Sequence, residues 1–445
     1  MTDLPNGWAQ TTLGAVAEYT NGRGFKKSEW SDSGRPIIRI QNLTGSGSSF
    51  NYFRGELLPK HQVKSGDLLV SWAATLSVHR WSDPREGALN QHIFKVEPFD
   101  IIDDRFLEHA LRFALDDMYR SAHGSGMVHI TRGKFESTPI LLPPMAEQHR
   151  IVEVLEDHLS RLDSAEASLN AVEQRVRALS GSCADDAVLG RAMGVPLSSQ
   201  PAAELRGRHD RFDYQALPPL PGNWEWKLAE SLCESISSGS TPRADLMQQG
   251  RGEIPFLKVY NIDPAGYVDF TKNPTYVSTT THRGQLLRSV TRPGDVVTNI
   301  VGPPLGKSAV IPDSHPEWNH NQAIVSFRAG EDIESDWLAA CLRSPFIVNL
   351  LKSTARATAG QFNIALSTCR ELPLPSPPID VQRELLQDLS ARQLALEHAS
   401  ASIRIARSRS IALRRSLLTA AFSGELVGSD PHNEPACTDL DALRA

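Results

Sequence analysis

The stretch LLPPMAEQHRIVEVLEDHLSRLD, from Leu141 to Asp163, places two prolines directly before a long pattern of apolar and polar residues. A second stretch of the same kind, PSPPIDVQRELLQDLSARQLALE, runs from Pro375 to Glu397. Proline suits a helix entrance because it lacks an N–H group and fixes φ, and it prevents the helix from extending backwards. Each stretch therefore predicts the start of a long helix.

Apolar residues recur every seven positions after Pro144, in the sets 155, 162, 169, 176 and 151, 165, 172, 179. The second stretch keeps this register at Leu385, Leu389, Leu396, Ala399, Ile403, Ala406 and Leu413. Sustained heptads are typical of a coiled coil, and we expect polar His158 and Arg392 in equivalent core positions. Because the first helix leads to the second half of the chain, the second must run back. The pattern predicts an antiparallel pair of about 35 helical residues each, or roughly 50 Å.

An internal repeat accounts for the two copies. An offset of 234 residues maps GMVHITRGKFESTPILLPPMAEQHRIV, from Gly126, onto GQFNIALSTCRELPLPSPPIDVQRELL, from Gly360. Upstream, RPIIRIQNL resembles EIPFLKVYNI, SGDLLVS resembles PGDVVTN, and LNQHIFKV resembles HNQAIVSF, in the same order. Each half is therefore predicted to be one globular module followed by one long helix.

Short β-branched runs bounded by turn residues fill the globular parts, among them PIIRI, GDLLVSW, HIFKV, GDVVTNI and AIVSF. RFLEHALRFALDDMYRSA has helical spacing at Leu107, Leu111 and Leu115. The predicted fold class is α+β: two similar mixed α/β modules, separated by two long helices in an antiparallel coiled coil, with a pseudo-two-fold internal repeat.

The two long helices carry opposite net charge. Residues 145–191 hold nine acidic and five basic side chains, whereas residues 379–423 hold four acidic and seven arginine side chains. This difference favours pairing in one orientation, although surface ion pairs are individually weak. The cluster Arg404, Arg407, Arg409, Arg414 and Arg415 could equally face phosphates or a partner protein.

Bulk properties limit the class of protein. The chain has 445 residues, is 40% hydrophobic and 22% charged, and has a formal net charge of −6. It has no apolar run long enough to span a membrane and no basic-then-apolar start, so we expect a cytoplasmic protein. Five scattered cysteines without a CxxC pair predict neither a zinc site nor a disulfide framework.

Motifs for catalysis are weak. VGPPLGKS (301–308) has three residues, not four, between its first glycine and Gly-Lys-Ser, so a surface loop is favoured over a phosphate loop. NPTY (273–276) differs from the Asn/Asp-Pro-Pro-Tyr signature of amino-methyltransferases at Thr275, and no glycine-rich cofactor loop accompanies it. The histidines form no metal-binding pattern. We predict no catalytic residue and no metal site in this chain.

Together, these features make the chain resemble the specificity subunit of type I restriction-modification systems. The resemblance rests on PPMAEQHRIVEVLE, PPIDVQRELLQDL, LRRSLLTAAFSGELV (413–427), the openings LPNGW and LPGNW, SSGSTP (237–242) and GDVVTNIVGPPLGKSAVI (294–311). It covers nearly all residues from Leu4 to Val427.

The resemblance implies two target recognition domains that each read one half of a bipartite, asymmetric site on double-stranded DNA. It implies a coiled coil that sets the half-site spacing and docks two methyltransferase subunits carrying S-adenosylmethionine. Restriction subunits using ATP and Mg²⁺ would join them, and this chain would hold no cofactor. The expected boundaries are recognition domains at 1–143 and 222–376, spacer helices at 144–194 and 377–427, a linker at 195–221 and a flexible tail at 428–445.

Base reading needs Arg, Lys, Asn and Gln on loops, with hydroxyl and amide groups on phosphates. In the first module the candidate DNA contacts are Arg23, Lys26, Lys27, Arg39, Gln41, Trp72, Arg80, Gln91, His123, Ser125 and His129. In the second module they are Ser240, Thr241, Arg243, Lys258, Tyr260, Asn261, Lys307, Asn321, Gln322, Arg356, Thr358, Gln361 and Asn363. The first module's loops depart more from the family pattern, at NGRGFKKSEW (21–30) and SWAATLSVHRW (71–81).

Two other classes of function remain open on the sequence. A non-catalytic two-headed coiled-coil scaffold without DNA binding would not associate with a methyltransferase. A standalone methyltransferase would bind S-adenosylmethionine by itself. The half-site bases and the spacer length do not follow from the sequence, because recognition loops obey no simple code.

Overall fold

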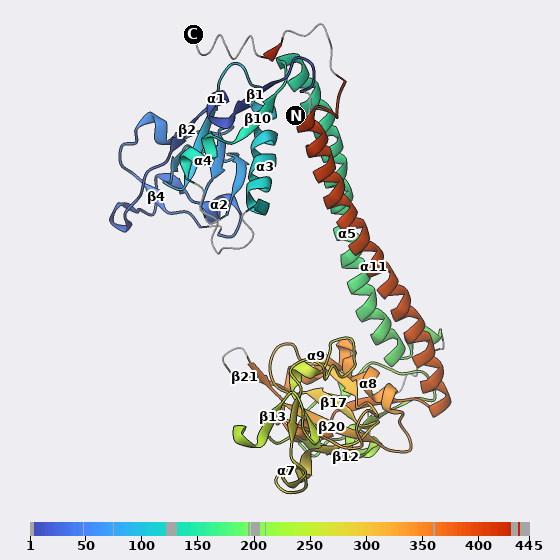
Figure 1. The fold of residues 1–445 in the computed structure, drawn as a ribbon. Helices are drawn as coiled ribbons and strands as arrows, with labels where there is room; N and C mark the ends of the chain where they lie inside the picture. Colours follow the sequence, from blue (N-terminus) through green and yellow to red (C-terminus); the bar gives the residue numbers. More distant parts are fainter. Residues whose placement is uncertain are drawn as a thin grey trace. The chain divides into compact units, whose positions relative to one another are not determined.

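The computed structural model describes residues 4–47, 49–73, 75–121, 131–194, 196, 205–209, 211–358, 361–428 and 435–436, and only the backbone of 121, 356–358 and 361–362. The chain divides into two compact units. Unit 1 comprises Met1–Leu169 and Ile405–Ala445, and unit 2 comprises Asn170–Arg404. Each long helix contributes residues to both units (Figure 1).

Unit 1 contains two four-stranded sheets and one strand pair. The first sheet is antiparallel, in the order β2 (Ala17–Asn21), β9 (Ile93–Pro98), β6 (Leu68–Ser71), β7 (Ser77–Arg80). The second has the order β4 (Tyr52–Phe53), β3 (Arg35–Ile38), β8 (Gly87–Leu89), β5 (Gln62–Val63), with β3 parallel to β8. The pair joins β1 (Ala9–Thr12) to β10 (Pro139–Leu142). The helices are α1 (Leu13–Val16), α2 (Ile40–Leu43), α3 (Asp104–Ser121) and α4 (Arg132–Glu136).

Unit 2 has the same strand orders. Its first sheet runs β12 (Cys233–Ser238), β20 (Ile324–Ala329), β17 (Val296–Asn299), β18 (Ser308–Val310). Its second runs β13 (Met247–Gln249), β15 (Thr275–Val277), β14 (Ile254–Leu257), β19 (Trp318–His320), β16 (Val290–Thr291), with β14 parallel to β19. β11 (Glu225–Leu228) pairs with β23 (Pro373–Ser376). Strand β13 and the hairpin β21 (Arg356–Thr358) to β22 (Gln361–Asn363) have no counterpart among the residues of unit 1 that the structure describes.

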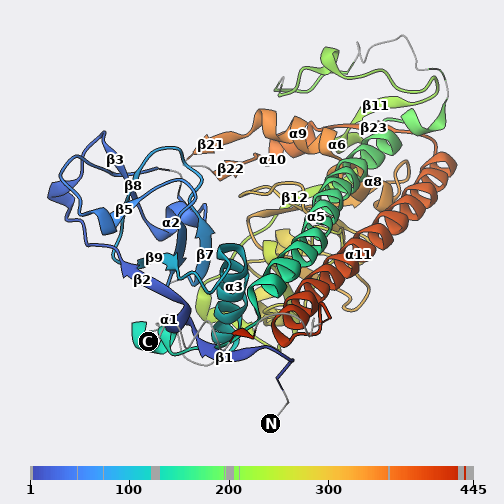
Figure 2. The same ribbon diagram turned by 90° about the horizontal axis from the view of Figure 1, so that it is seen from above.

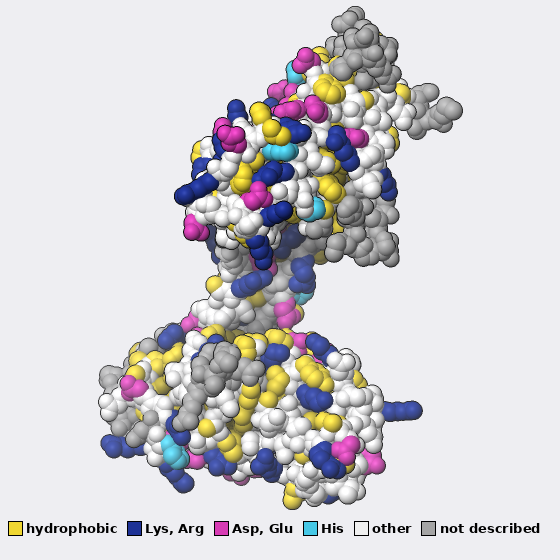
Figure 3. Space-filling view, turned by 90° about the vertical axis from the view of Figure 1, so that its left-hand side faces the viewer, with side chains coloured by type: hydrophobic (Ala, Val, Ile, Leu, Met, Phe, Trp, Pro, Cys, Tyr) yellow, Lys and Arg dark blue, Asp and Glu magenta, His cyan; other side chains and the backbone are white. Residues whose placement is uncertain are grey.

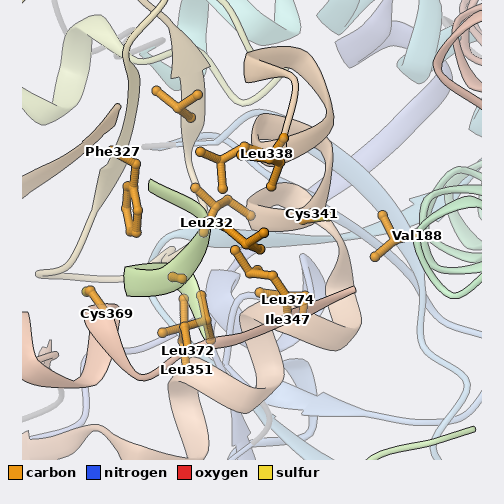
Figure 4. Close-up of a cluster of buried hydrophobic side chains, with 14 of the residues drawn as sticks. Val188, Leu232, Phe327, Leu338, Cys341, Ile347, Leu351, Cys369, Leu372 and Leu374 are labelled. Atoms are coloured by element: carbon orange, nitrogen blue, oxygen red, sulfur yellow. The ribbon is translucent and has the colours of Figure 1, made fainter. Parts of the chain in front are cut away.

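The helices of unit 2 are α6 (Ala229–Leu232), α7 (Thr279–Arg283), α8 (Ser335–Arg343), α9 (Pro345–Thr354) and α10 (Leu366–Arg370). Figure 4 shows side chains from several of these elements converging, with Leu338 and Cys341 of α8 near Leu232 and Leu374. Burial raises the pKa of the Cys369 thiol to about 12, so this thiol stays protonated at neutral pH. The apolar runs of the sequence thus form the expected mixed α+β fold.

The predicted linker is partly a core element. Phe212, Tyr214, Leu217 and Leu220 are buried in the main core of unit 2, around the single turn η4 (Tyr214–Ala216). In the predicted tail, Ala436 is also buried, and its N–H group donates to the carbonyl of Gly7. Both segments therefore add to the packing of a unit where the structure describes them.

The long helices are α5 (Met145–Val188), with 44 residues, and α11 (Ile379–Ser423), with 45 residues. In unit 1, Arg407 pairs with Glu166 at 2.9 Å and Arg414 pairs with Asp163 at 2.5 Å. The residue number on α11 rises from 407 to 414 while that of its partner on α5 falls from 166 to 163, so the two helical segments run in opposite directions. Figures 1 and 2 both show α5 and α11 side by side.

One heptad expectation is wrong. Arg392 is exposed and pairs with Asp388 of its own helix at 2.8 Å, rather than entering a core position. His158 is half-buried, and Leu413 is exposed. Within the described part of the chain, no helix is long and apolar enough to cross a membrane.

Candidate nucleic-acid interface

The main candidate surface of unit 2 lies at one edge of its first sheet. Ser238, Val325, Thr298 and Ser308 form a row across the four strands. Beyond this row the chain leaves the sheet in three loops, at 239–243, 300–307 and 321–323. The edge therefore gathers loops that are far apart in the sequence.

A close backbone crossing holds two of these loops together. The N–H of Gly239 donates to Ile324 O at 3.0 Å, and a Cβ atom at Gly239 would lie 1.9 Å from Asn321 O. Only glycine fits there. The Thr241 hydroxyl donates to the Gln322 side chain. The structure thus brings together four predicted contacts: Ser240, Thr241, Asn321 and Gln322.

Asn299 shapes the third loop, and the sequence analysis did not single it out. Its amide donates to Val301 O and Pro304 O, and its carbonyl oxygen accepts from the N–H of Lys307 at 3.0 Å. The side chain is 2% exposed. Asn299 therefore fixes the loop that carries predicted contact Lys307, which is half-buried.

The hairpin β21–β22 is tied to the same loop. Val301 forms a β-bridge with Asn363, and the N–H of Ile364 donates to Ile300 O at 3.0 Å. The predicted contacts Arg356, Thr358 and Gln361 belong to this hairpin by their backbone, and Asn363 is exposed on β22. The hairpin thus extends the candidate surface.

The buried side chain of Asn261 holds the loop after β14 in shape. The Asn261 carbonyl oxygen accepts from the N–H of Lys258, and its amide donates to Asp269 O and Lys272 O at 3.2 and 2.8 Å. Asn261 is fully buried, so it shapes the loop and is not placed for a base contact. The Lys258 ammonium lies 6.0 Å from the ring centroid of Tyr260. These two remain candidates.

In unit 1, Asn42 holds the corresponding loop by the same kind of hydrogen bonds, and the sequence analysis also did not single it out. Asn42 accepts from the N–H of Arg39 at 3.1 Å and donates to Gly47 O and Ser49 O. The Arg39 guanidinium lies 5.4 Å from the ring centroid of Trp30. Arg39 and Gln41 thus stand where Lys258 and Tyr260 stand in unit 2. The sequence did contain a signal for this role, because both halves have an asparagine at the same place after a predicted strand.

The sheet edge of unit 1 brings three predicted contacts together. The N–H of Arg23 donates to Leu89 O, the N–H of Trp72 donates to His92 O, and Gln91 lies in the intervening turn. The Arg23 guanidinium packs over Phe25 at 4.3 Å and pairs with Glu29 at 2.5 Å. Hydrogen bonding from the Lys26 N–H and from Arg23 lowers the pKa of the half-buried Glu29 carboxyl.

Arg80 does not join this edge. Along the β6–β7 pair, Ser77 faces Ser71 at the candidate edge, whereas Arg80 faces Leu68 at the other end. Its guanidinium bonds Asp104 and Glu108 of α3 at 2.7 and 2.8 Å. Arg80 therefore fastens α3 to the sheet, and the prediction of a DNA contact does not fit its position.

The remaining predicted contacts are more scattered. Lys26 and Lys27 are exposed at the turn η1 (Lys27–Glu29). Arg243 is exposed and pairs with Asp245 at 3.1 Å. His123, Ser125 and His129 lie outside the described residues.

Charge by itself does not outline the interface. Figure 3 shows Lys and Arg side chains spread over the visible face of each unit and interspersed with Asp and Glu. Among the described residues, no group of three or more His, Cys, Asp or Glu side chains could hold a metal ion. The arrangement offers polar side chains on fixed loops, which suits recognition of base edges and phosphates.

Known proteins share this architecture. Residues 5–174 match the family model described as the type I restriction modification DNA specificity domain. The specificity subunit of the type I restriction enzyme EcoBI from Escherichia coli is 25% identical over 440 residues, covering 96% of this chain and 88% of that subunit. The MjaVIII specificity subunit from Methanocaldococcus jannaschii is 19% identical over 401 residues, covering 87% and 86%.

Two solved structures share the fold. A chain from a study of assembly and conformational transition of the type I R-M system has a TM-score of 0.70 at 18% identity, covering 96% of this chain and 100% of its own length. The HsdS subunit from Thermoanaerobacter tengcongensis has a TM-score of 0.53 at 19% identity, covering 95% and 98%. The family match and the curated relatives make this chain similar to type I restriction-modification specificity subunits, and the two solved structures share its fold.

Proposed function

We propose that unit 1 and unit 2 each read one half of a bipartite, asymmetric DNA site. The observation that carries this proposal is the matched sheet edge. Both units have the same strand orders and the same glycine-mediated crossing, at Gly22 and Gly239. The side chains on the two edges differ, as Arg23 and Trp72 stand in unit 1 and Ser240 and Lys307 in unit 2. Two units with the same backbone arrangement and different side chains at the sheet edge are suited to read two different half-sites.

The recognition domains of this proposal are residues 1–143 and 222–376. Helices α5 and α11 form an antiparallel coiled coil about a pseudo-two-fold axis, and this coil sets the half-site spacing. The two ion pairs between α5 and α11 in unit 1 support the pairing. The coil also docks two methyltransferase subunits that carry S-adenosylmethionine. Restriction subunits supply the ATP- and Mg²⁺-dependent reaction, and this chain acts as the non-catalytic DNA-binding subunit.

Exposed apolar side chains on the helices support the docking role. Val172 and Leu179 of α5 are 43% and 53% exposed, and Ile405 and Ile411 of α11 are 54% and 65% exposed. Partner helices would bury such residues, since large apolar side chains gain free energy by leaving water.

Methylome sequencing tests the recognition proposal. A host that carries this chain with its methyltransferase should methylate adenine in a site with two unlike halves and a fixed gap. Methylation at a single uninterrupted motif would contradict the proposal, and absence of methyltransferase association would favour the scaffold alternative.

A lengthened coil tests the spacer role. One added heptad in each helix preserves the seven-residue register and lengthens the coil by about 10 Å, since each helical residue adds 1.5 Å. The gap should grow by about three base pairs at 3.4 Å each, with both half-site sequences unchanged. An unchanged gap would contradict the spacer role.

A further inference from the structure

A short turn precedes an edge strand of the second sheet in each unit. In unit 1 the turn is η2 (Pro59–His61), before β5, and in unit 2 it is η7 (Leu287–Ser289), before β16. The sequences GELLPKHQV (55–63) and GQLLRSVT (284–291) share a Leu-Leu pair at this place. The two units therefore repeat this turn as well as their sheets.

The first leucine of each pair is buried and holds the turn to its unit. Leu57 is 9% exposed and Leu286 is 0% exposed. A nearby side chain also binds each carbonyl oxygen. The Gln62 amide donates to Leu57 O at 3.1 Å, and the Ser289 hydroxyl donates to Leu286 O at 2.9 Å. Both turns thus have a fixed position on their units.

The second leucine of each pair faces solvent. Leu58 is 60% exposed and Leu287 is 63% exposed. Leucines this exposed add little to the stability of the fold, because apolar side chains stabilise it by leaving water. A single exposed leucine is common on protein surfaces, but here the same turn carries one in both units. The repetition favours a role in binding over chance exposure.

Both turns lie at the candidate sheet edge of their unit. β5 runs antiparallel to β8, and β16 runs antiparallel to β19. The residues before β5 and β16 therefore lie level with the residues after β8 and β19, which include the predicted contacts Gln91 and Asn321. In unit 2 the Arg288 guanidinium donates to Gly239 O at 3.3 Å. This bond holds η7 against the close backbone crossing of the edge.

The turn of unit 1 has the corresponding place. η2 contacts β2 as η7 contacts β12, and the glycine of each crossing directly follows that strand. Burial and then the positive charges of Lys60 and Arg23 lower the pKa of His61, so Arg23 lies within electrostatic reach of η2. Lys60 and Arg288 are both exposed. Each turn thus presents one apolar side chain and one cation at the edge.

The surroundings of the two leucines favour DNA as the partner. A protein partner on the leucines would cover the predicted base contacts of the same edge. In a stacked duplex the base faces are hidden, and the apolar group displayed at base edges is the C5-methyl group of thymine in the major groove. A cation beside the leucine suits the adjacent phosphates. Thymine therefore matches both side chains of each turn.

We propose that Leu58 and Leu287 each contact the methyl group of a thymine in the half-site read by their own unit, while Lys60 and Arg288 bind neighbouring phosphates. The inference rests on the proposed function, because it needs each unit to bind a half-site. It adds an apolar determinant of specificity to the polar contacts of the candidate surface.

The test uses the full complex with its methyltransferase subunits. Each thymine of the two half-sites, on either strand, is replaced in turn by deoxyuridine, which lacks only the C5-methyl group. One replacement in each half-site should weaken binding of the parent by roughly threefold to tenfold, the factor for one buried methyl group. Leu287→Ala should bind the unmodified duplex less tightly by a similar factor and lose its response in one half-site. Leu58→Ala should lose its response in the other.

A stability control separates binding from folding. Leu287→Ala should leave the midpoint of thermal unfolding unchanged, because the side chain is exposed. The neighbouring variant Leu286→Ala should lower that midpoint, because Leu286 is buried. A loss of affinity in Leu287→Ala without a loss of stability therefore reports a contact with the ligand.

Several results would overturn the thymine contact. Unchanged affinity of either alanine variant would do so, as would a deoxyuridine replacement that weakens the parent and its alanine variant equally. Weaker binding by Leu287→Ala without any response of the parent to deoxyuridine, or a half-site that lacks thymine, would favour insertion of the leucine between bases instead. Loss of a protein subunit from Leu287→Ala on size exclusion would favour a protein partner. If the parent complex fails to prefer its site over random DNA, the proposed function itself fails.

Discussion

Gln148 and Gln382 stand at the starts of the two long helices and make the same three hydrogen bonds. The Gln148 carbonyl oxygen accepts from the N–H of Asp103 at 2.7 Å. Its amide donates to Ile101 O at 3.0 Å and to Pro143 O at 2.9 Å. One side chain thus joins the helix start to the loop before α3.

Gln382 repeats each bond with the corresponding residues of unit 2. It accepts from the N–H of Glu334 at 2.9 Å and donates to Asp332 O and Pro377 O at 3.0 and 2.8 Å. Both glutamines are buried, at 1% and 0% exposure. Each amide therefore fixes the direction in which a helix leaves its globular part.

Replacing Gln382 with alanine should lower the free energy of unfolding by about 2 to 3 kcal/mol, because buried backbone groups lose their partners. Gln148→Ala should have an effect of the same size. Gln387→Ala is the matched control, since Gln387 is exposed on the same helix as Gln382. Urea denaturation of the full chain measures all three. Equal stability of the Gln382 and Gln387 variants would contradict the anchoring role.

The helix pairing in unit 1 can be tested by exchanging charges. Arg407→Glu places a carboxylate against Glu166 and should destabilise the chain by roughly 1 kcal/mol, as both side chains are only about one-third exposed. Adding Glu166→Arg should restore most of the loss. Thermal unfolding of the two single variants and the double variant gives the coupling. Additive losses without recovery would show that the pair does not form.

His320 predicts a pH dependence of stability. It is fully buried beside Asn321, and desolvation lowers its pKa to about 4 from an ordinary 6.5. Between these values the unfolded chain binds a proton that the folded chain does not, so stability is complete above about pH 6.5 and falls as the pH drops towards 4. In unit 1 the corresponding residue on β8 is Leu89.

The variant His320→Leu should remove this component, so its free energy of unfolding should change less between pH 6.5 and pH 4.5 than that of the parent. Denaturation at several pH values measures the difference. His398→Leu is the control, because His398 is exposed in the same unit. Parallel pH profiles for His320→Leu and the parent would show that His320 is not the buried neutral group.

Arg80 should contribute to the stability of the chain and not to DNA binding. Arg80→Ala removes bonds to Asp104 and Glu108 and should lower the free energy of unfolding of the chain by about 1 to 2 kcal/mol. In the full complex it should leave the salt dependence of DNA binding unchanged, because the side chain lies at the far end of β7. Anisotropy titrations would contradict this placement if Arg80→Ala reduced the salt slope.

The sequence predicted much of the repeat and of the strands, and less of the candidate DNA-contact residues. The offset of 234 aligned Gln148 with Gln382, and β-branched runs bounded by turn residues predicted the strands, because such patterns are local signals. It did not distinguish Asn261 from Tyr260, since both are polar loop residues. Only the fold shows that one side chain points inward to three backbone partners and the other stays partly exposed.

Helix register was a second limit. The heptad pattern assigned Arg392 to a core position, and Leu385, Ala399 and Ala406 of the same set are buried or half-buried, yet Arg392 is exposed. A seven-residue pattern fixes a stripe on a helix, but which edge of that stripe is buried depends on how the neighbouring helix crosses it. Arg392 therefore stays in water beside Asp388.

The most direct measurement of the two-headed account is methylome sequencing of a chain in which residues 222–376 are replaced by a second copy of residues 1–143. With two identical recognition domains, the methylated site should become a symmetric one, built from the unit 1 half-site and its inverted repeat. Methylation of the original asymmetric site by the duplicated chain would contradict the central claim that each unit reads its own half.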